Sequence, residues 1–222
     1  EIYLENYDKL LLSPGAEPIK PPFEGIDSDK IYTLRNIPDM DKIVAKTKNA
    51  QNFVVVGGGF IGLEVAENLI EAGKSVKLVE LGNQVMAPVD FDIASFVHEK
   101  AKQKGLELLL NVGVEKFNDK GETIEVFLNN GTSLETDAVI LAIGVKPETK
   151  LAVEAGLEIG ETRGILVNEF LQTSNPDIYA VGDAIEVAHY INNKKVLIPL
   201  AWPANRQGRI VADNIVLGNQ YK

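Results

Sequence analysis

Residues 53–62 read Phe-Val-Val-Val-Gly-Gly-Gly-Phe-Ile-Gly, and these ten residues decide the fold. The apolar run is typical of a buried strand, and Leu63–Ala72 after it has the pattern of a helix. Between them, Gly57, Gly59 and Gly62 have the spacing G-x-G-x-x-G. In a strand–turn–helix unit, the three glycines permit a tight turn, close approach of a phosphate to the backbone, and close packing of helix on strand. The pattern predicts a dinucleotide whose pyrophosphate lies at the amino end of the helix.

An acidic residue stands where such a site needs one. Ser75–Val79 predicts a second strand and is followed by Glu80, 18 residues after Gly62 (80 − 62 = 18), close to the usual spacing of about 20. A carboxylate there can accept hydrogen bonds from both hydroxyls of the adenosine ribose, and it would repel a 2′-phosphate. Residues 81–84 contain no Arg or Lys to bind that phosphate, so we expect NADH rather than NADPH. The alternative is an ordinary solvated Glu at a strand end.

Composition excludes several other classes of function. The chain has 222 residues, of which 45% are hydrophobic and 24% charged, as in a globular protein. A net charge of −10 argues against nucleic-acid or membrane partners, which need a basic face. There is no cysteine, and the only histidines are His98 and His189. We expect no disulfide and no metal site, and we interpret both histidines as surface or packing residues.

The first residues carry two further expectations. The chain opens Glu-Ile-Tyr-Leu-Glu and does not start with Met. This opening lacks the basic start and apolar core of a signal peptide. We therefore expect a fragment of a longer protein, located in the cytoplasm.

The remaining pattern predicts an α/β fold with a Rossmann-like core. Leu106–Leu110 predicts a third parallel strand, and residues 112–135 predict an antiparallel β-meander with a hairpin turn at Asn130-Gly131. Ala138–Ile143 is continuously apolar, which favours a strand buried on both faces. Further helices are predicted at residues 39–48, 91–104 and about 205–216. The pieces before and after this core are each too small to form a domain alone, so we expect them to pair with each other.

Five segments carry a more specific pattern. They are residues 7–16 (Tyr-Asp-Lys-Leu-Leu-Leu-Ser-Pro-Gly-Ala), 57–80, 142–147 (Ala-Ile-Gly-Val-Lys-Pro), 173–184 (Thr-Ser-Asn-Pro-Asp-Ile-Tyr-Ala-Val-Gly-Asp-Ala) and the tail at 199–209. In this order they resemble the FAD-dependent pyridine nucleotide–disulfide oxidoreductases. The resemblance is strongest to the branch of NADH oxidases, NADH peroxidases and coenzyme A–disulfide reductases, and it covers nearly the whole chain.

The resemblance implies a domain organisation and a reaction. It implies an NADH-binding Rossmann-like domain at 46–148, inserted into a partial FAD-binding domain made of 1–45 and 149–222. Hydride would pass from NADH to FAD and on to a disulfide, peroxide or oxygen in a longer, homodimeric enzyme. The family's first FAD motif, its usual redox cysteine and its dimerisation domain have no counterpart here. The fragment itself is therefore expected to be inactive.

The resemblance also implies roles for individual residues. Phe60 would be an aromatic gate over the flavin that the nicotinamide displaces, or else simply a helix-start residue packed on the sheet. Glu64, expected in the first helical turn where the dipole favours a carboxylate, would lie near the nicotinamide carboxamide. Gly144 would let the backbone pass close to NADH, or else simply end a strand. The predicted NADH-binding residues are Gly57, Gly58, Gly59, Phe60, Ile61, Gly62, Glu80 and Gly144.

The predicted FAD-binding residues lie outside the core. They are Ser13, Pro14, Gly15, Gly182, Asp183, Pro199, Leu200 and Ala201. Asp183 would contact the ribityl chain of the flavin. Residues 199–201 would lie near the flavin ring, with the amino end of the last helix directed at it.

Two other functions fit parts of the sequence. A stand-alone module that binds or senses NADH without turnover would explain the missing cysteine and the missing first FAD motif. A different Rossmann enzyme with its own substrate domain fits less well, because no acid–base residues stand out beyond the motifs.

Overall fold

The structure is a computed structural model that describes residues 3–222. It confirms the α/β class and divides into two compact units. The core unit is Pro18–Gly144, and the outer unit consists of Glu1–Glu17 and Val145–Lys222. Along the chain, the core unit is thus inserted between the two segments of the outer unit.

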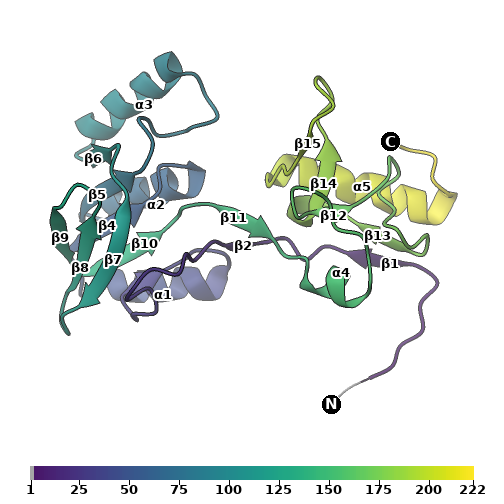
Figure 1. Cartoon of the computed structure of the whole chain (residues 1–222), viewed down its shortest axis with the longest axis horizontal. Helices are drawn as coiled ribbons and strands as arrows, with labels where there is room; N and C mark the ends of the chain where they lie inside the picture. The colour runs from purple at the N-terminus through teal and green to yellow at the C-terminus, as the bar shows by residue number, and fades with distance from the viewer. Residues whose placement is uncertain (1–2) are drawn as a thin grey trace. The chain divides into compact units, whose positions relative to one another are not determined.

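The core unit is built on a parallel five-stranded sheet. The strand order is β3 (Ile31–Tyr32), β10 (Ala138–Leu141), β4 (Asn52–Val56), β5 (Ser75–Glu80) and β6 (Glu107–Leu110). The last four of these strands are labelled in Figure 1. Every pairing in this sheet is parallel. All five strands therefore end at the same edge of the sheet.

Both faces of this sheet are covered. Phe53 and Val55 of β4 pack with α1 (Ile37–Thr47) and α2 (Phe60–Glu71), and α3 (Phe91–Gln103) covers the same face. Val54 and Val56 point to the other face, against the antiparallel meander of β7 (Val114–Asp119), β8 (Ile124–Leu128) and β9 (Ser133–Thr136). This alternation explains the continuous apolar sequence of the central strands, because a strand covered on both faces has no solvent side.

Residues 18–45 lie with the core unit, whereas the sequence predicts a boundary at residue 45. Ile31 of β3 pairs with Val139 of β10 at the edge of the parallel sheet. Ile43 of α1 is buried in the same hydrophobic cluster as β4. The paired residues Ile31 and Val139 are 108 positions apart (139 − 31 = 108), so local sequence does not reveal this pairing.

The outer unit has a smaller core around its own strands. β1 (Leu10–Leu12) pairs in parallel with β13 (Ile178–Ala180), and β14 (Ile185–Ala188) pairs with β12 (Ile165–Leu166) and β15 (Lys195–Val196). The other elements are β2 (Ala16–Pro18), β11 (Val145–Pro147), α4 (Lys150–Glu154), the 3-10 turn η1 (Gly182–Ala184) and α5 (Ala201–Leu217). Val211 of α5 is buried against this cluster.

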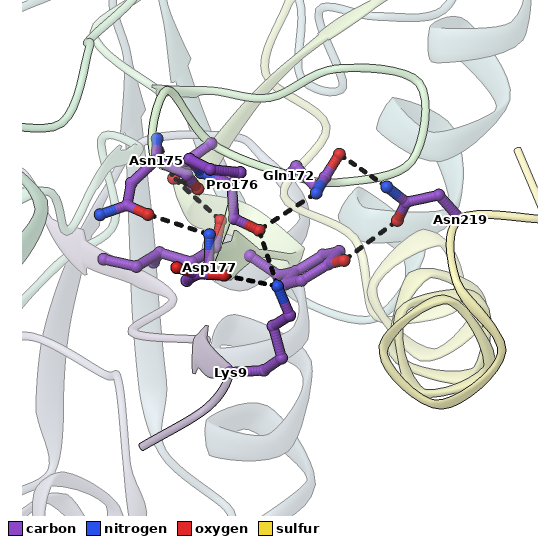
Figure 2. A network of polar contacts seen from close by, with 9 residues as sticks. Lys9, Gln172, Asn175, Pro176, Asp177 and Asn219 are labelled. Atoms are coloured by element: carbon purple, nitrogen blue, oxygen red, sulfur yellow. Dashed lines mark hydrogen bonds and ion pairs between the residues drawn. The ribbon is translucent and has the colours of Figure 1, made fainter. Parts of the chain in front are cut away.

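A polar network fixes the start of β1 beside the start of β13 (Figure 2). Lys9 Nζ donates to Asp177 Oδ1 at 2.5 Å and to the Pro176 carbonyl at 3.3 Å. Gln172 donates to the same carbonyl, and Asn219, just beyond α5, donates to Gln172 Oε1. Three segments distant in sequence are thereby joined at one end of the β1–β13 pair.

The last helix starts earlier than predicted. α5 begins at Ala201, with Leu200 as its N-cap, and not near Asn205. Pro203 falls in the first turn, where a backbone N–H has no helical partner and its absence costs nothing.

Two kinds of feature are absent from residues 3–222. No helix there is long and apolar enough to cross a membrane. The same residues contain no group of three or more metal-ligating side chains that could hold an ion.

Candidate functional site

The candidate nucleotide site lies at the carboxyl edge of the parallel sheet. Gly57 follows β4, Glu80 ends β5, and Gly144 lies three residues after β10. β10, β4 and β5 are neighbours in parallel register. The sheet therefore brings these three predicted residues to one edge, where ligands bind in open α/β sheets.

The turn between β4 and α2 requires its glycines. Gly57 has φ +106°, and a Cβ there would collide with the Ala142 carbonyl oxygen. A Cβ on Gly62 would collide with the Gly57 carbonyl oxygen. These positions accept only glycine, as predicted for a tight turn and a helix packed closely on its strand.

Gly59 has a different environment. It is the N-cap of α2, with φ −78°, and a Cβ there would meet nothing within 4 Å. Within the described chain, no side chain caps this helix end, so the N–H groups of Phe60, Ile61 and Gly62 lack helical partners. Open space beside unpaired N–H groups fits a pyrophosphate.

Glu80 is bound to the glycine turn itself. Its Oε2 accepts the Gly58 N–H at 2.6 Å, and its Oε1 accepts the Gly82 N–H at 2.7 Å. Since each carboxylate oxygen has about two acceptor positions, both oxygens can still accept a ribose hydroxyl. Glu80 is therefore more than a solvated strand-end residue, because it contacts the residue that precedes the N-cap.

Phe60 and Glu64 lie on α2, but their positions differ from the prediction. The helix begins at Phe60, three residues before the predicted Leu63, so Glu64 is in its second turn and the first turn holds no acidic residue. The expected dipole argument for Glu64 is therefore wrong. Phe60 is 51% exposed at the first helical position, so it is not packed into the sheet.

The third part of this edge is the segment after β10. The Ala142 N–H donates to the Val56 carbonyl, which keeps the segment beside the end of β4. Gly144 has φ +114° and is exposed, and its carbonyl accepts the Ile19 N–H. Its left-handed backbone explains the glycine by conformation alone.

The predicted flavin residues of the outer unit also share one edge. Ser13, Pro14 and Gly15 follow β1, while Gly182 and Asp183 lie just after β13, its parallel partner. The Val181 N–H donates to the Leu12 carbonyl, which extends the pairing to this edge.

The amino end of α5 packs on η1 in the same unit. The Gly182 N–H donates to Gln207 Oε1 at 2.8 Å, and a Cβ on Gly182 would lie 3.7 Å from the Ala204 Cβ. Pro199, Leu200 and Ala201 precede or start this helix and are exposed. Partial burial raises the pKa of the Asp183 carboxyl above its ordinary value.

The loop after β5 contacts the glycine turn, and sequence reasoning missed it. The Met86 N–H donates to the Gly58 carbonyl at 2.8 Å, and Val85 is fully buried against Gly58. The only local signal was an apolar Val85-Met86 pair inside a polar loop.

A separate hollow lies away from the nucleotide edge. A cavity of about 320 Å³ opens between α2 and α3, lined by Leu63, Ile70, Val97 and Ala101 among others. None of the three glycines of the phosphate turn, Gly57, Gly59 and Gly62, lines it. It is not part of the candidate site.

Comparison with known proteins agrees with this arrangement. Residues 4–208 match the family model of the pyridine nucleotide-disulphide oxidoreductases. The chain belongs to this family. The family and the fold expected from the sequence are confirmed, and the family's cofactors, NADH and FAD, are those that were expected.

Three relatives illustrate the match. The NADH oxidase of Methanocaldococcus jannaschii is 40% identical over 213 residues, which are 95% of this chain and 47% of that protein. The crystal structure of reduced Bacillus anthracis CoADR-RHD has a TM-score of 0.94 and 49% identity, covering 100% of this chain and 40% of that one. The structure of the water-forming NADH oxidase from Lactobacillus brevis bound to NADH has a TM-score of 0.89 and 34% identity. The match covers 96% of this chain and 47% of that one. The chain thus spans about half the length of the curated relatives it matches.

Proposed function

We propose that this chain binds NADH through its core unit and contributes part of an FAD site through its outer unit. It would belong to a flavin-dependent oxidoreductase that passes hydride from NADH to FAD and on to a disulfide, peroxide or oxygen. The observation that carries this proposal is the contact between Glu80 and Gly58, directly beside the open amino end of α2.

The core unit would hold the nucleotide along the carboxyl edge of its sheet. The N–H groups at the start of α2 would bind the pyrophosphate, with Gly59 leaving room for it. Glu80 would accept hydrogen bonds from the ribose hydroxyls and repel a 2′-phosphate. Gly144 would leave the backbone free of a side chain beside the nucleotide.

Phe60 and Glu64 remain candidates for the nicotinamide end. Both lie on α2 downstream of the phosphate turn, and both are exposed. Phe60 would cover the flavin face until the nicotinamide displaces it, and Glu64 would bind the carboxamide.

The outer unit would hold part of the flavin at the shared edge of β1 and β13. Ser13, Pro14 and Gly15 would line it, and Asp183 would bind the ribityl chain. The amino end of α5 would stabilise negative charge near residues 199–201, because a helix amino end carries partial positive charge. When bound, the nicotinamide supplies a hydride that the flavin accepts, while the protein positions both.

Calorimetric titration with NADH and NADPH, with an absorbance scan of the purified chain, tests this function. We expect NADH to bind more tightly than NADPH and little flavin to co-purify, because only part of a flavin site is present. Absence of NADH binding would refute the proposal for the core unit. A yellow protein would show that the flavin site is more complete than proposed.

The sequence that precedes Glu1 in the gene separates this function from a stand-alone NADH sensor. An upstream G-x-G-x-x-G motif and a redox cysteine would support the enzyme, and their absence would support the sensor. From the family resemblance we further propose that the longer protein is a cytoplasmic homodimer, which light scattering and cell fractionation would test.

A further inference from the structure

Residues 81–89 form a loop that is hydrogen-bonded to the glycine turn and packs against it. The Met86 N–H donates to the Gly58 carbonyl, and a Cβ on Gly58 would lie only 2.8 Å from Val85 Cγ1. Gly58 itself donates to Glu80 and precedes the N-cap Gly59. The position of this loop therefore influences the backbone that faces the phosphates.

Met86 has an unusual backbone for its residue type. Its φ is +54°, in the left-handed region that side chains other than Gly, Asn and Asp rarely adopt. Its N–H is bonded to Gly58, and its carbonyl accepts the Val89 N–H at 3.0 Å. Such a conformation persists only where surrounding contacts impose it, so the loop needs an anchor.

His98 of α3 provides that anchor. Its Nε2 accepts the Val85 N–H at 3.1 Å, and its ring contacts Phe91 edge-on at 6.2 Å between centroids. An imidazole nitrogen that accepts a hydrogen bond carries no proton, so His98 is neutral here, with its proton on Nδ1. The ring is half-buried between α3 and the loop.

We propose that His98 is a positioning residue for the dinucleotide: by accepting the Val85 N–H it holds loop 81–89 against Gly58 and so maintains the phosphate-binding turn. This inference rests on the proposed binding of NADH at this edge. It adds a residue outside the glycine motif, on a different helix, to the determinants of nucleotide affinity.

The charges around His98 favour its neutral form. Burial and then Lys102, one turn further along α3, lower the pKa of His98 below its ordinary value. Loop 81–89 has no ionisable side chain. The adjoining strands carry Glu80, bound to Gly58 and Gly82, and Glu107, paired with Lys77.

Protonation would break the anchor. With a proton on Nε2, two donors would face each other and the Val85 bond would be lost. Because the folded-state pKa lies below the unfolded value, His98 contributes stability that is complete above the unfolded value and is lost as the pH falls toward the folded one. Nucleotide affinity should fall as the pH passes down through the folded-state pKa, where His98 of the folded protein gains its proton.

The test compares His98→Leu, His98→Gln and wild type in the 222-residue chain at pH 7.5. A neutral hydrogen bond contributes about 0.5–1.5 kcal/mol, so His98→Leu should weaken NADH binding by about 2- to 12-fold. His98→Gln should keep most of the wild-type affinity for NADH, since its amide oxygen can accept the Val85 N–H. His189→Gln is the matched control, on the only other histidine, and should leave NADH affinity unchanged.

Two further readouts separate positioning from general stability. Protection of the Val85 amide from hydrogen exchange, taken relative to its intrinsic exchange rate at the same pH, should be lower in His98→Leu than in wild type without any nucleotide. In wild type this protection should be lower at acidic than at neutral pH. Affinity for NAD⁺, which is stable in acid, should fall with acidification in wild type and stay flat in His98→Gln.

The outcomes distinguish the two proposals. If wild type fails to bind NADH, the proposed function fails and this inference falls with it. If wild type binds but His98→Leu has the same affinity and pH profile, His98 is not a positioning residue while the proposed function stands.

Discussion

Glu80 and Gly58 are joined by a hydrogen bond of 2.6 Å from the Gly58 N–H to the Glu80 carboxylate. This bond connects the end of β5 with the turn that follows β4. One carboxylate thus both supports the turn beneath the proposed phosphate site and faces the position proposed for the ribose. Selection of the ribose and the shape of the turn are therefore coupled through a single side chain.

Replacing Glu80 with Ala should narrow the preference for NADH over NADPH. The change removes the acceptor for the ribose hydroxyls and the charge that repels a 2′-phosphate. We expect NADH affinity to fall by about 10-fold, corresponding to about 1.4 kcal/mol, with a smaller change for NADPH. Titration of both nucleotides measures the ratio, and Glu67→Ala, an exposed Glu on α2, is the matched control. An unchanged ratio would remove Glu80 from its proposed role.

Two glycines of the same motif should respond differently to Ala. At Gly62 the new Cβ would collide with the Gly57 carbonyl oxygen, so we expect a loss of about 2–4 kcal/mol in the free energy of unfolding. At Gly59 the Cβ would meet open space and the backbone is ordinary. Stability should change by less than about 0.5 kcal/mol while NADH affinity falls clearly. Thermal melts and titrations would contradict this if Gly59→Ala kept full affinity.

Replacing Asp183 with Asn should stabilise the unliganded chain slightly at neutral pH. Burial raises the pKa of Asp183, so the folded state disfavours the charged carboxylate. Its contribution is most favourable below the unfolded pKa and is lost as the pH rises through the folded pKa. Because the side chain is only partly buried, solvent screening limits the gain to about 1 °C in melting temperature. Melting curves at pH 3 to 8 should show the two proteins diverging as the pH rises.

The parts of the fold that the sequence predicts well are local. Gly57, Gly62 and Glu80 belong to one continuous β–α–β stretch. The spacing of residues within that stretch is enough to predict where the three lie. The start of α2 was misplaced because its N-cap, Gly59, has no side chain to signal a helix end, unlike the usual Ser, Thr or Asp. Because of that error, the prediction placed Glu64 in the first turn of α2, whereas it lies in the second.

The parts that were missed depend on contacts distant in sequence. The pairing of Ile31 with Val139 places β3 in the core unit, and no local pattern reports it. The bond between His98 and Val85 depends on how an irregular loop folds onto α3. A lone histidine in an amphipathic helix gives no sign of that contact, so the interpretation of His98 as a surface or packing residue did not include it.

Asn214 should be one of the polar residues that contribute most to the stability of the outer unit. It is 1% exposed, donates to the Phe170 and Tyr221 carbonyls at 3.1 and 2.8 Å, and accepts the Tyr221 N–H at 2.8 Å. Asn214→Ala would remove these three part-buried hydrogen bonds and leave a void at a buried position, so we expect a loss of about 2–4 kcal/mol in the free energy of unfolding.

Urea unfolding of Asn214→Ala beside Asn205→Ala measures this effect. Asn205 is exposed on the same helix, and Ala has the higher helix propensity, so Asn205→Ala should be neutral or slightly stabilising. The contrast separates the buried hydrogen bonds from any effect of Ala on α5 itself. Equal stability of the two variants would mean that water or a backbone shift replaces the bonds of Asn214.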